Sequence, residues 1–177
     1  MAKKETLDYG KLKKELTANG PARVYLLYGP EEYLREDFVS LLKKACLPDG
    51  DDDFSYKKLN QENFSPRAFE DAVDALPFLT ERTFVEVRSV DLNRMNESDS
   101  NRLTKQISDL PDYCTVAFIQ DVGYEPDGRK KLTKAIKKHG KEVEFTEQPQ
   151  NSIVKWVRKR FAAHQKMITP ENAEFLV

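Results

Sequence analysis

Apolar blocks alternate along the chain with amphipathic stretches, and turn residues separate them. The blocks are nearly uninterrupted, which is typical of strands buried on both faces of a parallel sheet. The stretches between the blocks repeat apolar residues at helical spacing. The pattern predicts strands over residues 24–28, 54–59, 83–87, 115–119 and 143–145. It predicts helices over residues 7–16, 31–45, 65–76, 96–110 and 127–139.

Strands that alternate with helices in this way predict an α/β domain, doubly wound around a parallel sheet with right-handed crossovers. Ser65 followed by Pro66 is typical of a helix start, with serine as N-cap and proline at the first helical position. We expect Gly140 to cap the helix that ends at His139. The helix that starts at Pro66 is expected to bury Phe69, Ala72, Val73 and Leu76.

The chain changes character after the fifth predicted strand. Residues 146–149 end in proline and predict a linker, and a helix is expected to begin at Ser152. Thr169 and Pro170 predict a further helix, which has barely begun when the sequence reaches Val177. We therefore expect one domain over residues 1–146 and a partial helical domain over residues 147–177, in a chain that is a fragment.

The first predicted strand ends in glycine and runs directly into a helix. A nucleotide-binding α/β protein keeps its phosphate loop at this point, with a second glycine and then Lys-Ser/Thr. Here Gly29 is followed by Pro30, Glu31 and Glu32. The two carboxylates stand in the first helical turn, where a helix would otherwise attract an anion. We expect a scaffold that binds neither nucleotide nor any other cofactor.

A second candidate site is the connection Leu76-Pro77-Phe78-Leu79, which precedes the third predicted strand. Proline disfavours helical conformation at the residue before it, so Phe78 and Leu79 fall outside the helical stripe. The residues alone favour a simple interpretation in which both side chains pack in the core. The alternative is an exposed apolar wedge that fills a pocket on a partner.

The third candidate is a basic run. Residues 129–141 contain seven Lys or Arg residues and no acid, and Arg129, Lys130, Lys131 and Lys134 are candidates for contact with DNA phosphates. A solvated helix face is the simpler explanation, because no aromatic residues interleave and the formal net charge of the 177 residues is −1.

Other features exclude several classes of protein. The longest apolar runs fall far short of the roughly 18 residues of a membrane span, and the N-terminal residues lack the apolar core of a signal peptide. Cys46 and Cys114 are isolated, which indicates reduced thiols in a cytoplasmic protein. No catalytic triad or metal-ligand cluster stands out. A P-loop-like ATPase or nucleotide kinase with a degenerate loop, and a weak DNA-binding module, stay as alternatives.

Four stretches of the chain, in this order and spacing, resemble the family of delta subunits of bacterial DNA polymerase III. These clamp-loader subunits open the sliding clamp. The stretches are residues 24–29 with 31–34, 75–82, 115–119, and 156–163 with 168–176. Each is moderately specific alone, and together they cover nearly the whole chain.

The resemblance implies an AAA+-type, three-layer module with five parallel strands, followed by the start of a small helical lid. It implies a non-catalytic subunit of the DNA-directed DNA polymerase (nucleotidyltransferase) holoenzyme, which does not hydrolyse ATP itself. The implied partners are the sliding clamp, which is the beta subunit, other clamp-loader subunits through a C-terminal collar missing here, and DNA indirectly. The family's clamp-inserting apolar pair maps onto Phe78 and Leu79, supported by Leu76. Asp74 departs from the glutamine that often begins clamp-binding motifs.

Overall fold

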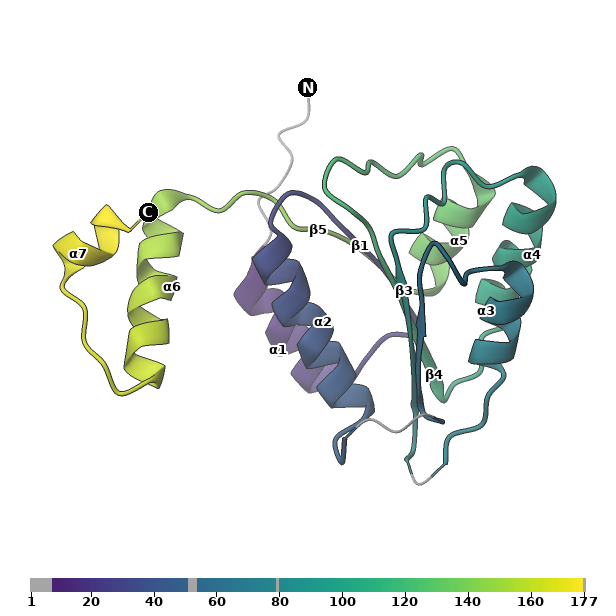
Figure 1. The fold of residues 1–177 in the computed structure, drawn as a ribbon, viewed down its shortest axis with the longest axis horizontal. Helices are drawn as coiled ribbons and strands as arrows, with labels where there is room; N and C mark the ends of the chain where they lie inside the picture. The colour runs from purple at the N-terminus through teal and green to yellow at the C-terminus, as the bar shows by residue number, and fades with distance from the viewer. Residues whose placement is uncertain (1–7, 51–53, 79, 177) are drawn as a thin grey trace. The chain divides into compact units, whose positions relative to one another are not determined.

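Helices and strands alternate along the first four fifths of the chain, as the sequence predicts (Figure 1). The structure is a computed structural model and describes residues 8–50, 54–78 and 80–176. Its elements are α1 (Tyr9–Asn19), β1 (Val24–Tyr28), α2 (Glu32–Cys46), β2 (Tyr56–Leu59), α3 (Pro66–Val73), β3 (Thr83–Arg88), α4 (Glu97–Ser108), β4 (Cys114–Ile119), α5 (Lys131–His139), β5 (Lys141–Glu144), α6 (Gln150–Ala163) and α7 (Pro170–Phe175).

The five strands form one sheet in the order β2-β3-β4-β1-β5, and every pair is parallel. All residues of β1 and β4 are buried, which explains why both read as uninterrupted apolar runs. The edge strand β2 carries Lys57 and Lys58 and is less buried. The prediction of a parallel, five-stranded α/β domain is confirmed.

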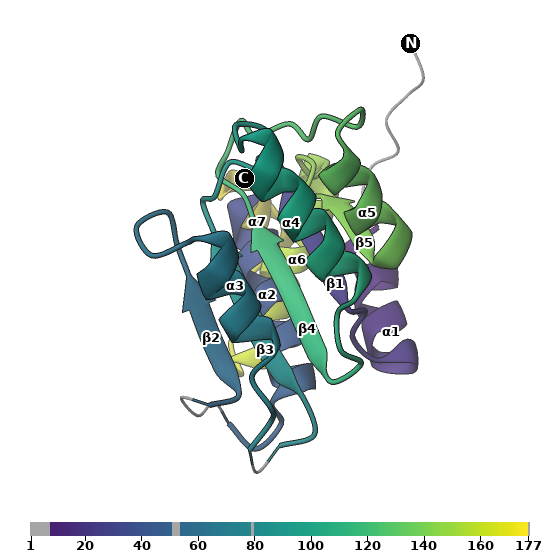
Figure 2. The same cartoon turned by 90° about the vertical axis from the view of Figure 1, so that its right-hand side faces the viewer.

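Helices cover both faces of the sheet, which makes three layers (Figure 2). Helices α1 and α2 lie on one face and enclose a core around Phe38 and Phe145. Helices α3, α4 and α5 lie on the other face and enclose a second core around Phe69 and Phe118. Because the strands are parallel, all their carboxyl ends lie at one edge of the sheet and all their amino ends at the opposite edge.

Helix α3 ends earlier than the apolar spacing predicts. Its N-cap is Ser65, whose side chain accepts a hydrogen bond from the backbone N–H of Ala68, as expected. Its last residue is Val73, and Leu76 is 72% exposed instead of buried. Proline at position 77 has no N–H to donate to the carbonyl of Val73, so the helix gains nothing from continuing. The prediction that Leu76 joins the buried stripe is therefore wrong.

Helix α5 begins at Lys131, four residues later than predicted. Asp127 instead forms a turn, in which its side chain accepts hydrogen bonds from the backbone and the guanidinium of Arg129. Gly140 follows α5, but its φ of −160° is extended and not the left-handed conformation of a glycine cap. A Cβ at Gly140 would lie 1.9 Å from the carbonyl oxygen of Val24, so close packing requires glycine there.

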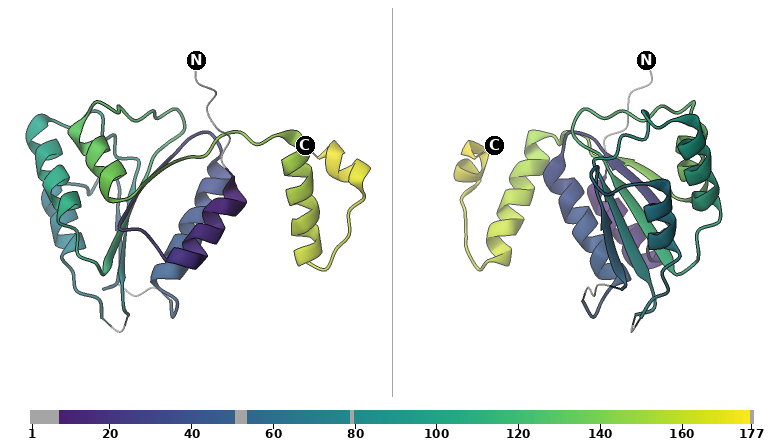
Figure 3. Two further views of the ribbon diagram at one scale, coloured as in Figure 1. Left: turned by 180° about the vertical axis from the view of Figure 1, so that it is seen from behind. Right: turned by 45° about the vertical axis from the view of Figure 1, so that its right-hand side comes forward.

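The described residues from Thr146 onward form a second compact unit, separate from the α/β unit that ends at Phe145. Within it α6 packs against α7 (Figure 3). Thr169 caps α7 by accepting a hydrogen bond from the N–H of Asn172, as the sequence predicts. Within the described ranges, no helix of either unit is long and apolar enough to cross a membrane.

Candidate functional site

The turn after β1 is closed by the backbone that follows β5. Gly29 has a φ of +112°, and a Cβ there would lie 2.5 Å from the carbonyl oxygen of Phe145. The N–H of Phe145 donates to the carbonyl of Tyr28 at 2.7 Å, and the N–H of Glu31 donates to the carbonyl of Phe145 at 3.0 Å. In a phosphate loop such backbone N–H groups face the anion. Here the N–H of Glu31 is already bound within the protein.

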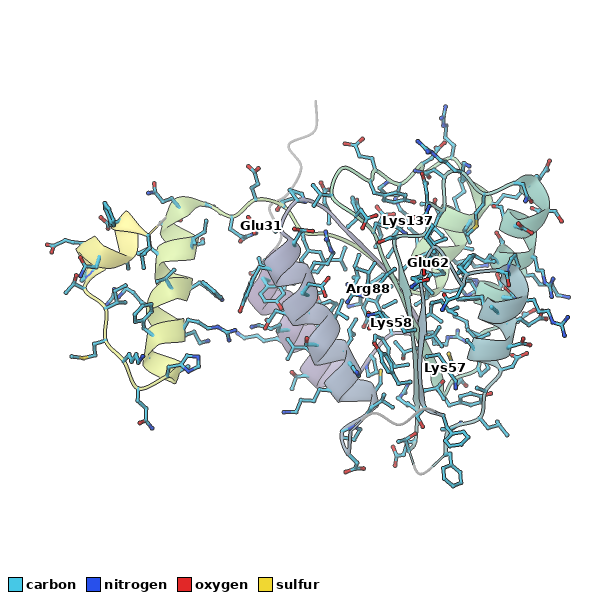
Figure 4. All side chains as sticks on the ribbon, in the orientation of Figure 1. Glu31, Lys57, Lys58, Glu62, Arg88 and Lys137 are labelled. Carbon is cyan, nitrogen blue, oxygen red and sulfur yellow. The ribbon has the colours of Figure 1, made fainter. Side chains whose placement is uncertain are left out.

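A buried cation from α2 lies behind this turn. The Arg35 side chain is only 4% exposed, and its guanidinium donates to the carbonyl of Gly29 at 2.6 Å and to the carboxylate of Glu32 at 3.3 Å. Of the two acids of the turn, Glu32 pairs with Arg35. Glu31 is the residue directly before α2 and is labelled in Figure 4.

The carboxyl end of β3 carries a second internal network. In an NTPase this end would be expected to offer an acidic pair to magnesium, but β3 ends in Arg88. Both terminal nitrogens of Arg88 donate to the carboxylate of Glu36, each at 2.8 Å, and its Nε donates to Glu86. Figure 4 labels Arg88. The hydrogen bonds from Arg88 lower the pKa of the Glu36 carboxyl. The network ties α2 to β3.

The two cysteines and the potential metal ligands among the described residues form no reactive site. Cys46 and Cys114 are free and buried, and burial raises the pKa of each thiol to about 11, which keeps both protonated. Within residues 8–50, 54–78 and 80–176, no group of three His, Cys, Asp or Glu residues is placed to hold a metal ion.

Apolar side chains reach the solvent at the amino ends of the strands, opposite the end of the sheet that carries the Gly29 turn. Leu76 is 72% exposed and Phe78 is 57% exposed. The interpretation that Phe78 packs in the core is therefore wrong, because Phe78 lies on the loop from α3 to β3, outside both elements. Leu79 lies outside the described residues, so its expected place in the wedge stays a prediction.

Sequence reasoning missed an aromatic neighbour of the wedge. Phe54, assigned to the second strand, precedes β2 and is 62% exposed. Its ring centroid lies 5.5 Å from that of Phe78. One signal was available in the sequence, since Phe54 directly follows the three aspartates of residues 51–53, and an apolar side chain after so polar a stretch of sequence is unexpected.

The basic residues of the run differ in their partners within the structure. Arg129 pairs with Asp127 at 3.0 Å, and the Lys130 ammonium donates to the carbonyl of Asn93, so both are engaged in the loop before α5. Lys131 and Lys134 lie on the exposed face of α5. Contact of Arg129, Lys130, Lys131 and Lys134 with DNA stays a prediction.

Comparison with known proteins assigns the family. The family model described as "DNA polymerase III, delta subunit" matches residues 25–146. The DNA polymerase III subunit delta of Bacillus subtilis (strain 168) is 31% identical over 161 residues, which cover 87% of this chain and 46% of that protein.

Solved structures of other proteins share the fold. The Bacillus subtilis DNA clamp loader delta protein superimposes with a TM-score of 0.73 at 27% identity, over 96% of this chain and 51% of that one. A gamma subunit-related protein of DNA polymerase III from Thermotoga maritima, at 18% identity and a TM-score of 0.54, shares the fold over 96% of this chain and 58% of its own. The chain spans about half the length of these relatives. It belongs to the family of DNA polymerase III delta subunits.

Proposed function

We propose that the protein is a clamp-loader subunit that binds the sliding clamp through the wedge, defined as Leu76, Phe78 and Leu79. The observation that carries the proposal is the exposure of Leu76 and Phe78 on a short loop between α3 and β3. Large apolar side chains gathered on the surface mark interaction sites, and aromatic anchors dominate the binding energy of interfaces. Membership of a clamp-loader subunit family supports the sliding clamp as the partner.

The wedge would act on the clamp by shifting a population. A ligand favours one conformation only by its differential affinity, so the wedge must bind an opened or loosened clamp more tightly than a closed one. Nothing in this action requires the subunit to hydrolyse ATP, and other loader subunits would supply ATP-driven motion. We place this action in the cytoplasm, with DNA reached indirectly through the clamp and the loader.

The first test is direct binding to the beta sliding clamp. With the protein immobilised, we expect surface plasmon resonance to show saturable binding of the clamp. Each wedge side chain buried in an apolar pocket contributes roughly 1.5–3 kcal/mol, and together with the rest of the interface we expect an affinity of about micromolar strength. Faster release of clamp from nicked circular DNA would report opening. Absence of binding at clamp concentrations of about 100 μM would refute the proposal.

The second test concerns nucleotide. We expect calorimetry with Mg-ATP to give no saturable heat, because the N–H of Glu31 is bonded to Phe145 and the Gly29 carbonyl to Arg35. The chain also lacks the Lys-Ser/Thr that would hold phosphates and magnesium after Gly29. Saturable Mg-ATP binding would instead favour the ATPase or kinase alternative, and titration with Mg²⁺ alone is the control.

A further inference from the structure

We propose that Phe54 and the turn that carries it form the second half of the clamp-binding surface, an inference that rests on the proposed function. Among the described residues of the α/β unit, the exposed large apolar side chains are Tyr33, Phe54, Leu76, Phe78 and Val122. Three of these five belong to the wedge and its neighbour, with Phe54 and Phe78 in ring contact and Leu76 two residues before Phe78. This clustering is not expected of apolar residues scattered singly on a surface.

Hydrogen bonds fix the two aromatic residues relative to each other. The hydroxyl of the fully buried Ser55 donates to the carbonyl of Phe78 at 3.2 Å, a link between positions 23 residues apart in sequence. The Thr80 hydroxyl lies 2.7 Å from that of Ser55. The loop that carries the wedge is therefore held by the turn before β2 at Phe78 and at Thr80.

The same turn is anchored to the sheet. The carbonyl of Ser55 accepts a hydrogen bond from the N–H of Phe84 at 2.8 Å, and the pairing of β2 with β3 begins at the next residue, Tyr56. Phe54 thus extends from the end of a rigid ladder and supports the ring of Phe78 from one side. A side chain held in its bound position loses less conformational entropy on association, which strengthens binding. Phe54 therefore acts as a positioning residue, and its own exposed face adds apolar contact area.

A cavity borders the wedge loop and shapes what the partner must present. It has a volume of about 550 Å³ and is lined by Ala45, Cys46, Pro48, Asp49, Thr80, Glu81 and Arg82. Thr80 lines this cavity and also contacts Ser55, so the cavity and the aromatic pair share one loop. The lining includes charges of both signs at Asp49, Glu81 and Arg82. A partner surface that matches these features would offer an apolar pocket for the rings and polar groups beside it.

The experiment compares clamp affinities of variants of the whole protein by surface plasmon resonance. Phe54→Ala is expected to weaken clamp binding about tenfold, since it removes apolar contact and the support of Phe78. Ser55→Ala keeps both rings but removes the bond to the Phe78 carbonyl, and we expect a loss of about threefold or more. Val122→Ala, an equally exposed apolar truncation on the loop after β4 at the opposite edge, is expected to change nothing.

A double-mutant cycle shows whether Phe54 acts through Phe78, and thermal unfolding shows whether a variant is destabilised. If Phe54 acts through Phe78, the loss for Phe54→Ala with Phe78→Ala is smaller than the product of the two single losses. Thermal unfolding of each variant, followed by circular dichroism, shows whether a loss of affinity reflects unfolding, and Phe54→Leu keeps apolar bulk where alanine does not.

The outcomes are distinct. If Phe78→Ala loses affinity and Phe54→Ala does not, the inference is overturned and the proposed function stands. If the unaltered protein does not bind the clamp, the proposed function fails and the inference fails with it. If sedimentation shows a dimer that Phe54→Ala dissociates while clamp affinity stays unchanged, the aromatic pair is a contact between copies, and the inference is again overturned.

Discussion

Replacing Phe78 and Leu79 together by alanine is expected to abolish measurable binding to the sliding clamp while leaving the fold intact. Each side chain buried in an apolar pocket contributes roughly 1.5–3 kcal/mol, so the pair contributes about 3–6 kcal/mol. That range corresponds to a loss of affinity of about 100-fold to more than 10,000-fold. Because Phe78 is 57% exposed, its truncation removes little internal packing. Surface plasmon resonance with immobilised clamp measures the loss directly.

Two controls make this result specific to the wedge. Val122→Ala removes an exposed apolar side chain on the loop after β4 and should retain full affinity. Circular dichroism and thermal unfolding should be unchanged in the double variant. An unchanged affinity in a folded double variant would show that the clamp binds elsewhere on the protein. The single variants Phe78→Ala and Leu79→Ala then apportion the loss between the two side chains.

The fold was largely predictable because local pattern and tertiary structure agree in most of it. The strands β1 and β4 are buried on both faces, so their sequences are apolar without interruption and identify the sheet. Caps at Ser65 and Thr169 have a strictly local cause and were found correctly. The end of α3 was missed because two local signals conflict there. Helical spacing favours burial of Leu76, and the missing N–H of Pro77 ends the helix before it.

The candidate site was less predictable, because its main contacts join distant residues. The absence of Lys-Ser/Thr after Gly29 is visible in the sequence, but the use of Arg35 to bind the carbonyl of Gly29 is not. The two hydrogen bonds from the Arg88 guanidinium to the Glu36 carboxylate join residues 52 positions apart. The ring contact of Phe54 with Phe78 arises because β2 and β3 are neighbours in the sheet, which apolar periodicity does not specify.

Gly29→Ala is expected to destabilise the protein severely. At a φ of +112° an alanine is strained by about 1–3 kcal/mol, and its Cβ would meet the Phe145 carbonyl oxygen at 2.5 Å. Phe145 cannot withdraw without losing its bonds to Tyr28 and Glu31. We expect the free energy of unfolding to fall by about 3–5 kcal/mol in total, and Tm by roughly 6–20 °C. Urea and thermal unfolding followed by circular dichroism measure both quantities.

Gly50→Ala provides the matched control for this prediction. Gly50 has a nearly equal φ of +108°, but no heavy atom lies within 4 Å of a Cβ built there. It therefore reports the strain of the backbone conformation without the collision. If Gly29→Ala lowers stability no more than Gly50→Ala, close packing against Phe145 is not the reason for glycine at position 29. A larger loss means that the backbone after β5, and not a bound phosphate, requires glycine in this turn.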